Sequence, residues 1–206
     1  METVLGIKGR DFVMVAADTT YARSIVVMKE DENKIFNVSD NILMAAIGDA
    51  GDCVQFIEFI EKNVALYKMS NGYELTPKSA AHYTRRNLAD YLRSHTPFHV
   101  NMLVAGFDPK EGPELQFIDY LASANSVNFA GHGYGSMFCS SIFDRYYHAD
   151  ITREEAYDVM KKCVIEIQKR LLVSLNNFKV AMVDKDGIQN LELINSKSLK
   201  EHSEAA

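Results

Sequence analysis

Runs of apolar residues near the N-terminus predict buried strands. Residues 3–8 show short apolar alternation before Gly9, and residues 12–17 form a nearly continuous apolar run rich in valine. Residues 42–48 form another such run, which is followed by a loop at 48–52. Continuous apolar runs of this length are typical of strands that are covered on both faces.

Apolar residues then recur at helical spacing in two segments. Asp52 is expected to cap the first helix, which should end near Asn71-Gly72. The second helix should begin at Thr76-Pro77, because threonine suits the cap and proline suits the first turn, and it should end before Pro97. The predicted buried positions are Val54, Ile57, Ile60, Val64 and Tyr67 in the first helix and Ala81, Leu88, Tyr91 and Leu92 in the second.

The second half of the chain repeats this order of elements. Strands are predicted at residues 100–107 and 115–120, joined into a hairpin by the turn at 108–113. The glycine-punctuated segment 131–135 should lead into a helix that reaches Tyr146. Another helix should start at the capping-box pattern 152–155 and carry Ala156, Val159, Cys163, Ile167 and Leu171. A final hairpin is predicted from residues 178–183 and 188–194.

This order, strands and two helices followed by strands, two helices and strands, predicts an α+β fold. Hairpins imply antiparallel pairing, and strands buried on both faces need a cover on each side. Two stacked antiparallel sheets, each covered outside by a helix pair, satisfy both conditions, so a four-layer α-β-β-α sandwich is expected. Residues 1–195 are predicted to form one domain, and the polar segment 196–206 a flexible tail.

Composition and charge narrow the classes of partner. The chain has 206 residues, 47% of them hydrophobic, and a formal net charge of -6. A mildly acidic chain has no electrostatic footprint for nucleic acid, and the basic residues Arg85, Arg86 and Arg93 beside Asp90 are interpreted as a solvated helix face or a subunit contact. No apolar run is long enough to span a membrane, and no signal peptide is recognised. The cytoplasm, the nucleus or both are therefore expected.

No cofactor or metal site is predicted. Cys53, Cys139 and Cys163 are odd in number and far apart, so buried thiols in a reducing compartment are favoured over zinc ligation or disulfides. The six histidines show no ligand spacing.

Several segments resemble one family. Residues 3–9, 13–18, 34–35 and 48–52 resemble the start of a mature β subunit of the proteasome, within the N-terminal nucleophile hydrolase superfamily. Residues 70–77, 84–90 and 132–135 are similar to a non-catalytic member that occupies the fourth position of the eukaryotic β ring. The resemblance covers nearly the whole chain and implies the four-layer fold of that superfamily.

The chemistry of active family members is what this resemblance implies for the site. Their N-terminal threonine attacks peptide bonds, and its own α-amine, with a pKa of about 8, acts as base. An aspartate, a lysine, a serine–aspartate–serine set and a backbone N–H for the oxyanion complete the site. The matching positions in this chain are Asp18, Lys34, the oxyanion glycine Gly48 and the last serine of the set, Ser174.

Other positions depart from the family pattern. The nucleophile position falls on Glu2, whose carboxylate cannot replace a hydroxyl with an adjacent amine. The first serine of the set falls on Tyr134, and its aspartate falls on Leu171. Methionine before glutamate is normally retained, so Thr3 is not expected to gain a free amine. The resemblance therefore implies a non-catalytic subunit without cofactor or metal.

Alternatives remain at this stage. An active N-terminal-threonine endopeptidase would use Thr3 after removal of Met1 and Glu2, and a stand-alone α/β domain with an unrelated partner is a third hypothesis. Asp18 and Lys34 are interpreted as a structural ion pair rather than as remnants of catalysis. Gly48 also has a structural interpretation besides the oxyanion role, because a turn that needs positive φ would require glycine there.

The implied role is structural. The chain would complete a seven-membered β ring of the complex that degrades ubiquitinated proteins, and would contact α-ring subunits and the opposite β ring, with no nucleic acid or membrane as partner. The helix ending at Tyr146 is the expected contact with the opposite ring. Candidate interface residues are Arg145, Tyr146 and Tyr147, because tyrosine and arginine often anchor interfaces, and His132, on the resemblance alone.

Overall fold

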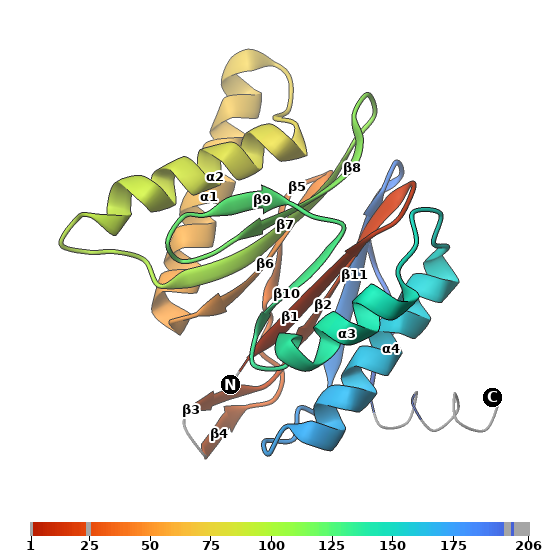
Figure 1. The fold of residues 1–206 in the computed structure, drawn as a ribbon. Helices are drawn as coiled ribbons and strands as arrows, with labels where there is room; N and C mark the ends of the chain where they lie inside the picture. Colours follow the sequence, from red (N-terminus) through yellow and green to blue (C-terminus); the bar gives the residue numbers. More distant parts are fainter. Residues whose placement is uncertain (1, 24–25, 196–198, 200–206) are drawn as a thin grey trace.

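The computed structural model describes residues 2–23, 26–195 and 199. This part of the chain contains two five-stranded antiparallel sheets, a two-stranded hairpin and four helices (Figure 1). The expected tail at 196–206 lies outside the described residues, apart from Leu199. Within the described residues, no helix is both long and apolar enough to span a bilayer.

The first sheet has the order β10-β1-β2-β11-β12 and contains both ends of the predicted domain. Its first strand in sequence pairs with its second so that Val4 lies opposite Ala17, and with β10 so that Thr3 lies opposite Gly133. These strands are β1 (Thr3–Lys8), β2 (Phe12–Asp18), β10 (Phe129–Gly133), β11 (Phe178–Asp184) and β12 (Gly187–Asn190).

The second sheet has the order β5-β6-β7-β8-β9, so its strands follow one another in sequence except for the helix pair between β6 and β7. Its strands are β5 (Ile35–Ser39), β6 (Ile42–Gly48), β7 (Val100–Asp108), β8 (Gly112–Ile118) and β9 (Ala124–Ser126). A separate hairpin of β3 (Tyr21–Arg23) and β4 (Val26–Lys29) projects between β2 and β5 along the chain.

Two helix pairs cover the outer faces of the sheets (Figure 1). The helices α1 (Ala50–Asn71) and α2 (Pro77–Leu92) pack on the second sheet, and α3 (Ser136–Tyr146) and α4 (Arg153–Arg170) pack on the first. The predicted four-layer α-β-β-α sandwich is confirmed. It follows from strands such as β2, whose seven residues are all buried.

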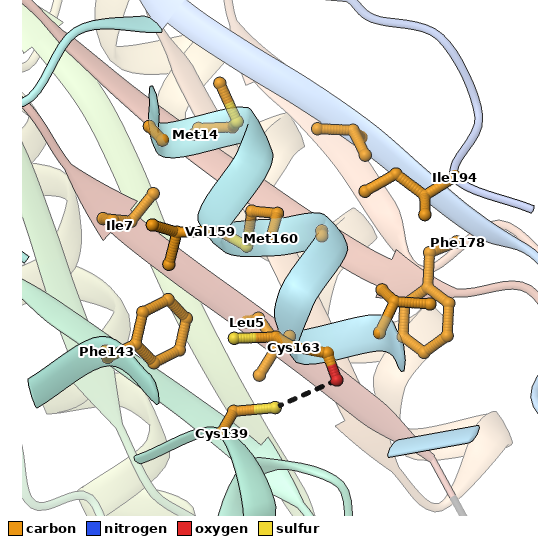
Figure 2. Packing of buried hydrophobic residues seen from close by; sticks show 14 of the residues in the cluster. Leu5, Ile7, Met14, Cys139, Phe143, Val159, Met160, Cys163, Phe178 and Ile194 are labelled. Carbon is orange, nitrogen blue, oxygen red and sulfur yellow. Dashed lines mark hydrogen bonds between the residues drawn. The ribbon is translucent and has the colours of Figure 1, made fainter. Parts of the chain in front are cut away.

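Three hydrophobic layers correspond to the three interfaces of the sandwich. Alternate residues of β2 point to opposite sides: Met14 joins the layer under α3 and α4, whereas Val13 and Val15 join the layer between the sheets. Figure 2 shows the first of these layers, in which Met160 and Cys163 of α4 pack above β1 and β2. All three cysteines are free and buried, as the sequence predicts.

Helix caps follow the sequence signals with one exception. Thr76 caps α2 through the Ser79 N–H, and Thr152 forms a capping box with Glu155. The cap of α1 is Asp49 and not Asp52, because the Asp49 side chain accepts from the N–H groups of residues 51 and 52. This correction matters for Asp52, which instead accepts a hydrogen bond from the His99 N–H at 2.9 Å.

The buried faces of α1 and α2 are rotated slightly from the prediction. Val54 is 40% exposed and Tyr91 is 37% exposed, while Tyr67 and Leu92 are only partly buried. The residues that fill the interface are Cys53, Phe56, Ile57, Ile60 and Val64 in α1 and Pro77, Ala80, Ala81, Thr84 and Leu88 in α2. The buried face of α2 is therefore made mainly of small residues and Leu88, with Tyr83 packed at its margin.

The structure differs from the prediction in strand β10 and at the ends of several other elements. Residues 131–133 belong to β10, although their glycines indicate a turn, and α3 begins only after Gly135. Leu171 lies just beyond α4, as its C-cap residue, and β8 begins at Gly112 rather than Leu115. In the last hairpin β12 ends at Asn190, and Ile194 instead makes an isolated bridge to Phe178.

Candidate functional site

Asp18 and Lys34 form a buried ion pair at the ends of two strands. Asp18 is the last residue of β2, and Lys34 immediately precedes β5. The Lys34 Nζ lies 2.8 Å from the Asp18 Oδ2 and also donates to the Thr20 carbonyl oxygen at 2.7 Å. The side chains are 0% and 4% exposed, so each charge needs the other.

The Glu2 carboxylate completes a bridge across the two sheets. Its Oε1 lies 3.3 Å from the Lys34 Nζ, and its Oε2 accepts a hydrogen bond from the Gly48 N–H at 3.2 Å. Glu2 directly precedes β1, and Gly48 ends β6. The Glu2 side chain therefore contacts the Lys34 ammonium and also accepts the hydrogen bond of the N–H group at the predicted oxyanion position.

Two carboxylates share one ammonium in this site. Burial raises the pKa of the Asp18 carboxyl, while the Lys34 ammonium and the N–H groups of Thr3 and Thr20 oppose that rise. The Thr3 N–H donates to the Asp18 Oδ1 at 2.7 Å, and the Thr20 N–H donates to its Oδ2 at 3.1 Å. These contacts make Asp18 a structural hub that ties β1, β2 and the start of β5 together.

Close backbone approach explains two of the glycines. Gly48 has a φ of 149°, and a Cβ atom there would overlap the His99 carbonyl. Gly133 has a φ of 87°, and a Cβ atom there would overlap the Glu2 carbonyl. Both positions need glycine for backbone reasons, in agreement with the structural interpretation of Gly48.

Thr3 is buried, and its polar groups are bonded within the fold. It is 0% exposed, and its Oγ1 accepts a hydrogen bond from the Gly135 N–H at 3.2 Å. Its own nitrogen is a strand amide that donates to Asp18. The Thr3 hydroxyl is therefore committed to the junction between β10 and α3.

The space beside the site is too small for a peptide side chain. A cavity of about 20 Å³ is lined by Glu2, Lys34 and Gly48 together with other polar and apolar residues, among them Glu32 and Cys53. Sites for small ligands commonly measure about 300–1,000 Å³, whereas about 10–15 Å³ holds one water. Burial and the nearby Glu2 carboxylate raise the pKa of the Cys53 thiol to about 12, so this cysteine is not a thiolate near neutral pH.

The remaining positions that the resemblance implies do not join this cluster. Ser174 is exposed in the loop between α4 and β11, and within the described residues it makes none of the hydrogen bonds of Asp18, Lys34 or Glu2. Tyr134 is 61% exposed. Leu171 packs against the hydrophobic layer under α3 and α4, which suits its apolar side chain.

The interface candidates differ in exposure. Arg145 and Tyr146 are exposed at the end of α3, where the guanidinium lies over the tyrosine ring at 5.3 Å. Tyr147 is half-buried and packs against Phe129 with ring centroids 5.3 Å apart. His132 is a correction, because it is only 6% exposed.

His132 is an internal packing residue in this chain. Its ring stacks on Phe117 with centroids 4.0 Å apart, and its Nε2 lies 3.1 Å from the Met102 carbonyl oxygen. Both partners belong to the second sheet, so His132 joins the two sheets. Burial lowers the pKa of the imidazole to about 4.

Some members of the site are invisible to sequence reasoning. Thr20 contributes only backbone atoms, and the Thr3–Gly135 contact joins residues far apart in sequence. The only sequence signal for the role of Thr20 is the short polar run Asp18-Thr19-Thr20 after a buried strand. Among the described residues, no group of three or more His, Cys, Asp or Glu residues is placed to hold a metal ion.

Comparison with known proteins places these features in a family. A model described as Proteasome subunit matches residues 1–183. Proteasome subunit beta type-2-A of Arabidopsis thaliana is 45% identical over 190 residues, covering 92% of this chain and 93% of the relative. Proteasome subunit beta type-2 of Oryza sativa is 46% identical over 187 residues, covering 91% and 88%. Proteasome subunit beta type-4 of Saccharomyces cerevisiae is 38% identical over 193 residues, covering 93% and 98%.

Proposed function

The chain belongs to the proteasome subunit family, and we propose that it completes a β ring of the core particle without itself cutting peptide bonds. Its relatives along nearly the full length are named as β subunits of type 2 and type 4. The fold is that of the family, with two antiparallel sheets between helix pairs.

The position of the Glu2 carboxylate carries the non-catalytic part of this proposal. A peptide hydrolase needs a nucleophile beside its base and an unoccupied donor for the oxyanion. Here an acidic side chain bridges the Lys34 ammonium and the Gly48 N–H. A carboxylate is a poor nucleophile for an amide, and its negative charge opposes the development of a second one at the same donor.

Two further observations weigh against Thr3 as a substitute nucleophile. Its hydroxyl is buried and bonded to the Gly135 N–H, so a substrate has no path to it without displacement of β1 or α3. The adjoining cavity of about 20 Å³ offers no room for the side chain that precedes a scissile bond. Removal of Met1 and Glu2 would change neither the Gly135 contact nor the register of Thr3 with Gly133.

The proposed partners follow from the family. The chain would stand in a seven-membered β ring, contact the α ring on one side and meet a second β ring on the other. It would shape the chamber in which ubiquitinated proteins are degraded, in the cytoplasm and the nucleus.

Covalent labelling of the assembled particle tests the non-catalytic role. The particle would be treated with a threonine-directed inhibitor, separated into subunits and weighed by intact mass spectrometry. Neighbouring subunits with an N-terminal threonine should gain the mass of the inhibitor and serve as the internal control, whereas this chain should keep its mass. A stoichiometric adduct on Thr3 of this chain would overturn the proposal.

A further inference from the structure

A groove lies between α2 and the edge of the second sheet, far along the chain from the Glu2 site. It has a volume of about 840 Å³ and is open to solvent along its length. Figure 1 shows α2 crossing beside β9, and the two elements are in contact. Its walls are the first half of α2 and residues 122–124, with Gln116 of β8 between them.

The groove concentrates positive charge in an acidic chain. Lys78, His82 and Arg85 line it, and its lining contains no aspartate or glutamate. The whole chain has a net charge of -6, so this is a local reversal of sign. In the described part of the chain, neither Lys78 nor Arg85 lies within 4.0 Å of an acidic group. Exposed cations without an acidic partner in the chain are available to an outside anion.

The basic residues are arranged in a row. Positions 78, 82 and 85 fall on one helix face, and the distance from the first to the last is about 10 Å along the axis. An extended peptide covers about the same distance in three residues. The Arg85 Nε donates to the Ala122 carbonyl oxygen at 3.1 Å, which fixes the guanidinium against the opposite wall.

We propose that this groove binds an extended, acidic peptide segment of another protein chain. Carboxylates spaced along such a segment would meet Lys78, His82 and Arg85, and the Ser79 and Ser123 hydroxyls would bond to its backbone. Ala81 and Ala124 leave the floor low enough for a main chain to lie close. Nucleic acid is disfavoured, because the groove lining has no phenylalanine, tyrosine or tryptophan for base stacking and the basic row is short. The proposal depends on the groove alone and not on whether the chain is catalytic.

A labelled peptide tests this binding with the full chain. The probe is an acetylated and amidated octapeptide of alternating glutamate and serine, and its neutral counterpart carries glutamine in place of glutamate. Fluorescence anisotropy should detect the acidic probe at low salt and not the neutral one. The double variant Lys78→Gln/Arg85→Gln should lower the affinity by about tenfold or more.

A matched variant separates site binding from general charge. Arg86→Gln/Arg93→Gln removes the same charge from the same helix, but neither residue lines the groove, so the affinity should change by about twofold or less. Lys78→Gln alone tests the groove without the Arg85–Ala122 contact, and thermal unfolding of every variant checks the fold.

Four outcomes would overturn the proposal. They are no binding of the acidic probe, equal binding of the neutral probe, equal losses in the two double variants, and tighter binding of a single-stranded oligonucleotide that the groove variant abolishes. A loss confined to the groove variants, with normal thermal stability, supports it.

Discussion

The Thr3 hydroxyl accepts a hydrogen bond from the Gly135 N–H, although 132 residues separate the two along the chain. The contact fastens the first strand of the molecule to the start of α3, and both groups are buried. It assigns a structural task to the hydroxyl that the rival hypothesis would make a nucleophile.

Gly135→Ala should destabilise the fold, because the added methyl would overlap Oγ1 and Cγ2 of Thr3. Overpacking of this kind costs about 1–3 kcal/mol. Thr3→Ala in the same chain should recover about 1 kcal/mol or more relative to the sum of the single changes. Urea unfolding of the four proteins measures this coupling. Thr3→Ser, which keeps the oxygen, is the matched control and should recover less; purely additive effects would contradict the contact.

Lys34→Met should be strongly destabilising, because it leaves Asp18 buried without its cation. Breaking a buried ion pair by removing one partner costs about 3–5 kcal/mol. Lys29→Met removes a similar group from an exposed pair with Glu32 and should shift the unfolding midpoint far less, because solvent screens that pair. Equal shifts of the two unfolding midpoints would show that the Asp18–Lys34 pair contributes little.

Glu2→Thr should not create a peptidase, even when a cleavable leader makes residue 2 the N-terminus. Tyr134 and Leu171 still replace two polar groups of the family pattern, and groups that act as a unit are grossly non-additive. The adjoining cavity also remains small. Fluorogenic peptides measure turnover, and intact mass confirms that the leader is removed. Hydrolysis above that of wild type would show that the missing serine and aspartate matter less than proposed.

His132 should make the fold sensitive to acid. Its pKa is about 4 in the folded chain and near 6.5 when unfolded, so unfolding takes up a proton between these values. The contribution of neutral His132 to the free energy of unfolding is therefore fully present above pH 6.5. It falls by about 3 kcal/mol as the pH drops to about 4, and it stays constant below that pH. His132→Gln, which keeps a donor but does not titrate, should lose less stability over that range. Parallel pH profiles in urea unfolding would contradict this role.

Arg145→Ala should weaken the pairing of β rings while leaving the subunit folded. Arg145 is exposed beside Tyr146, and the Lys162 ammonium lies 4.0 Å from the same ring, so a flat cationic and aromatic surface ends α3. Loss of a true anchor costs about 1–3 kcal/mol of association. Native mass spectrometry of half-particles and full particles gives the ratio. Arg86→Ala on the opposite helix pair is the control, and equal ratios for both would place the contact elsewhere.

Local signals predicted the elements whose ends are marked chemically. Thr76 before Pro77, and Thr152 three residues before Glu155, place two helix starts correctly. The prediction of Asp52 as the cap of α1 was wrong, because the helix starts earlier and the Asp49 side chain accepts from its first N–H groups. The strand β10 escaped prediction because its glycines indicate a turn, and it is a strand only because β1 lies beside it.

The main residues of the candidate site were predicted from the sequence, but most of the contacts between them were not. The resemblance identified Asp18, Lys34, Gly48 and Glu2 separately, but their meeting point depends on the register of β1 against β2 and on the second sheet stacked beside them. The contacts of Glu2 with both Lys34 and Gly48 needed the structure. His132 was assigned to an interface on the resemblance alone, whereas stacking on Phe117 buries it.

The contacts of Glu2 with Lys34 and Gly48 also affect local opening of this region and the substitutions that it tolerates. Enzymes keep some hydrogen-bond donors without an internal acceptor, so that these donors can bind the transition state. This arrangement lowers the stability of the fold. In this chain an internal acceptor takes that place, so the Gly48 amide should exchange with solvent hydrogen more slowly than in a Glu2→Ala variant. On the proposed non-catalytic role, substitutions near residue 2 are constrained by packing and charge balance within the subunit rather than by the shape of a substrate.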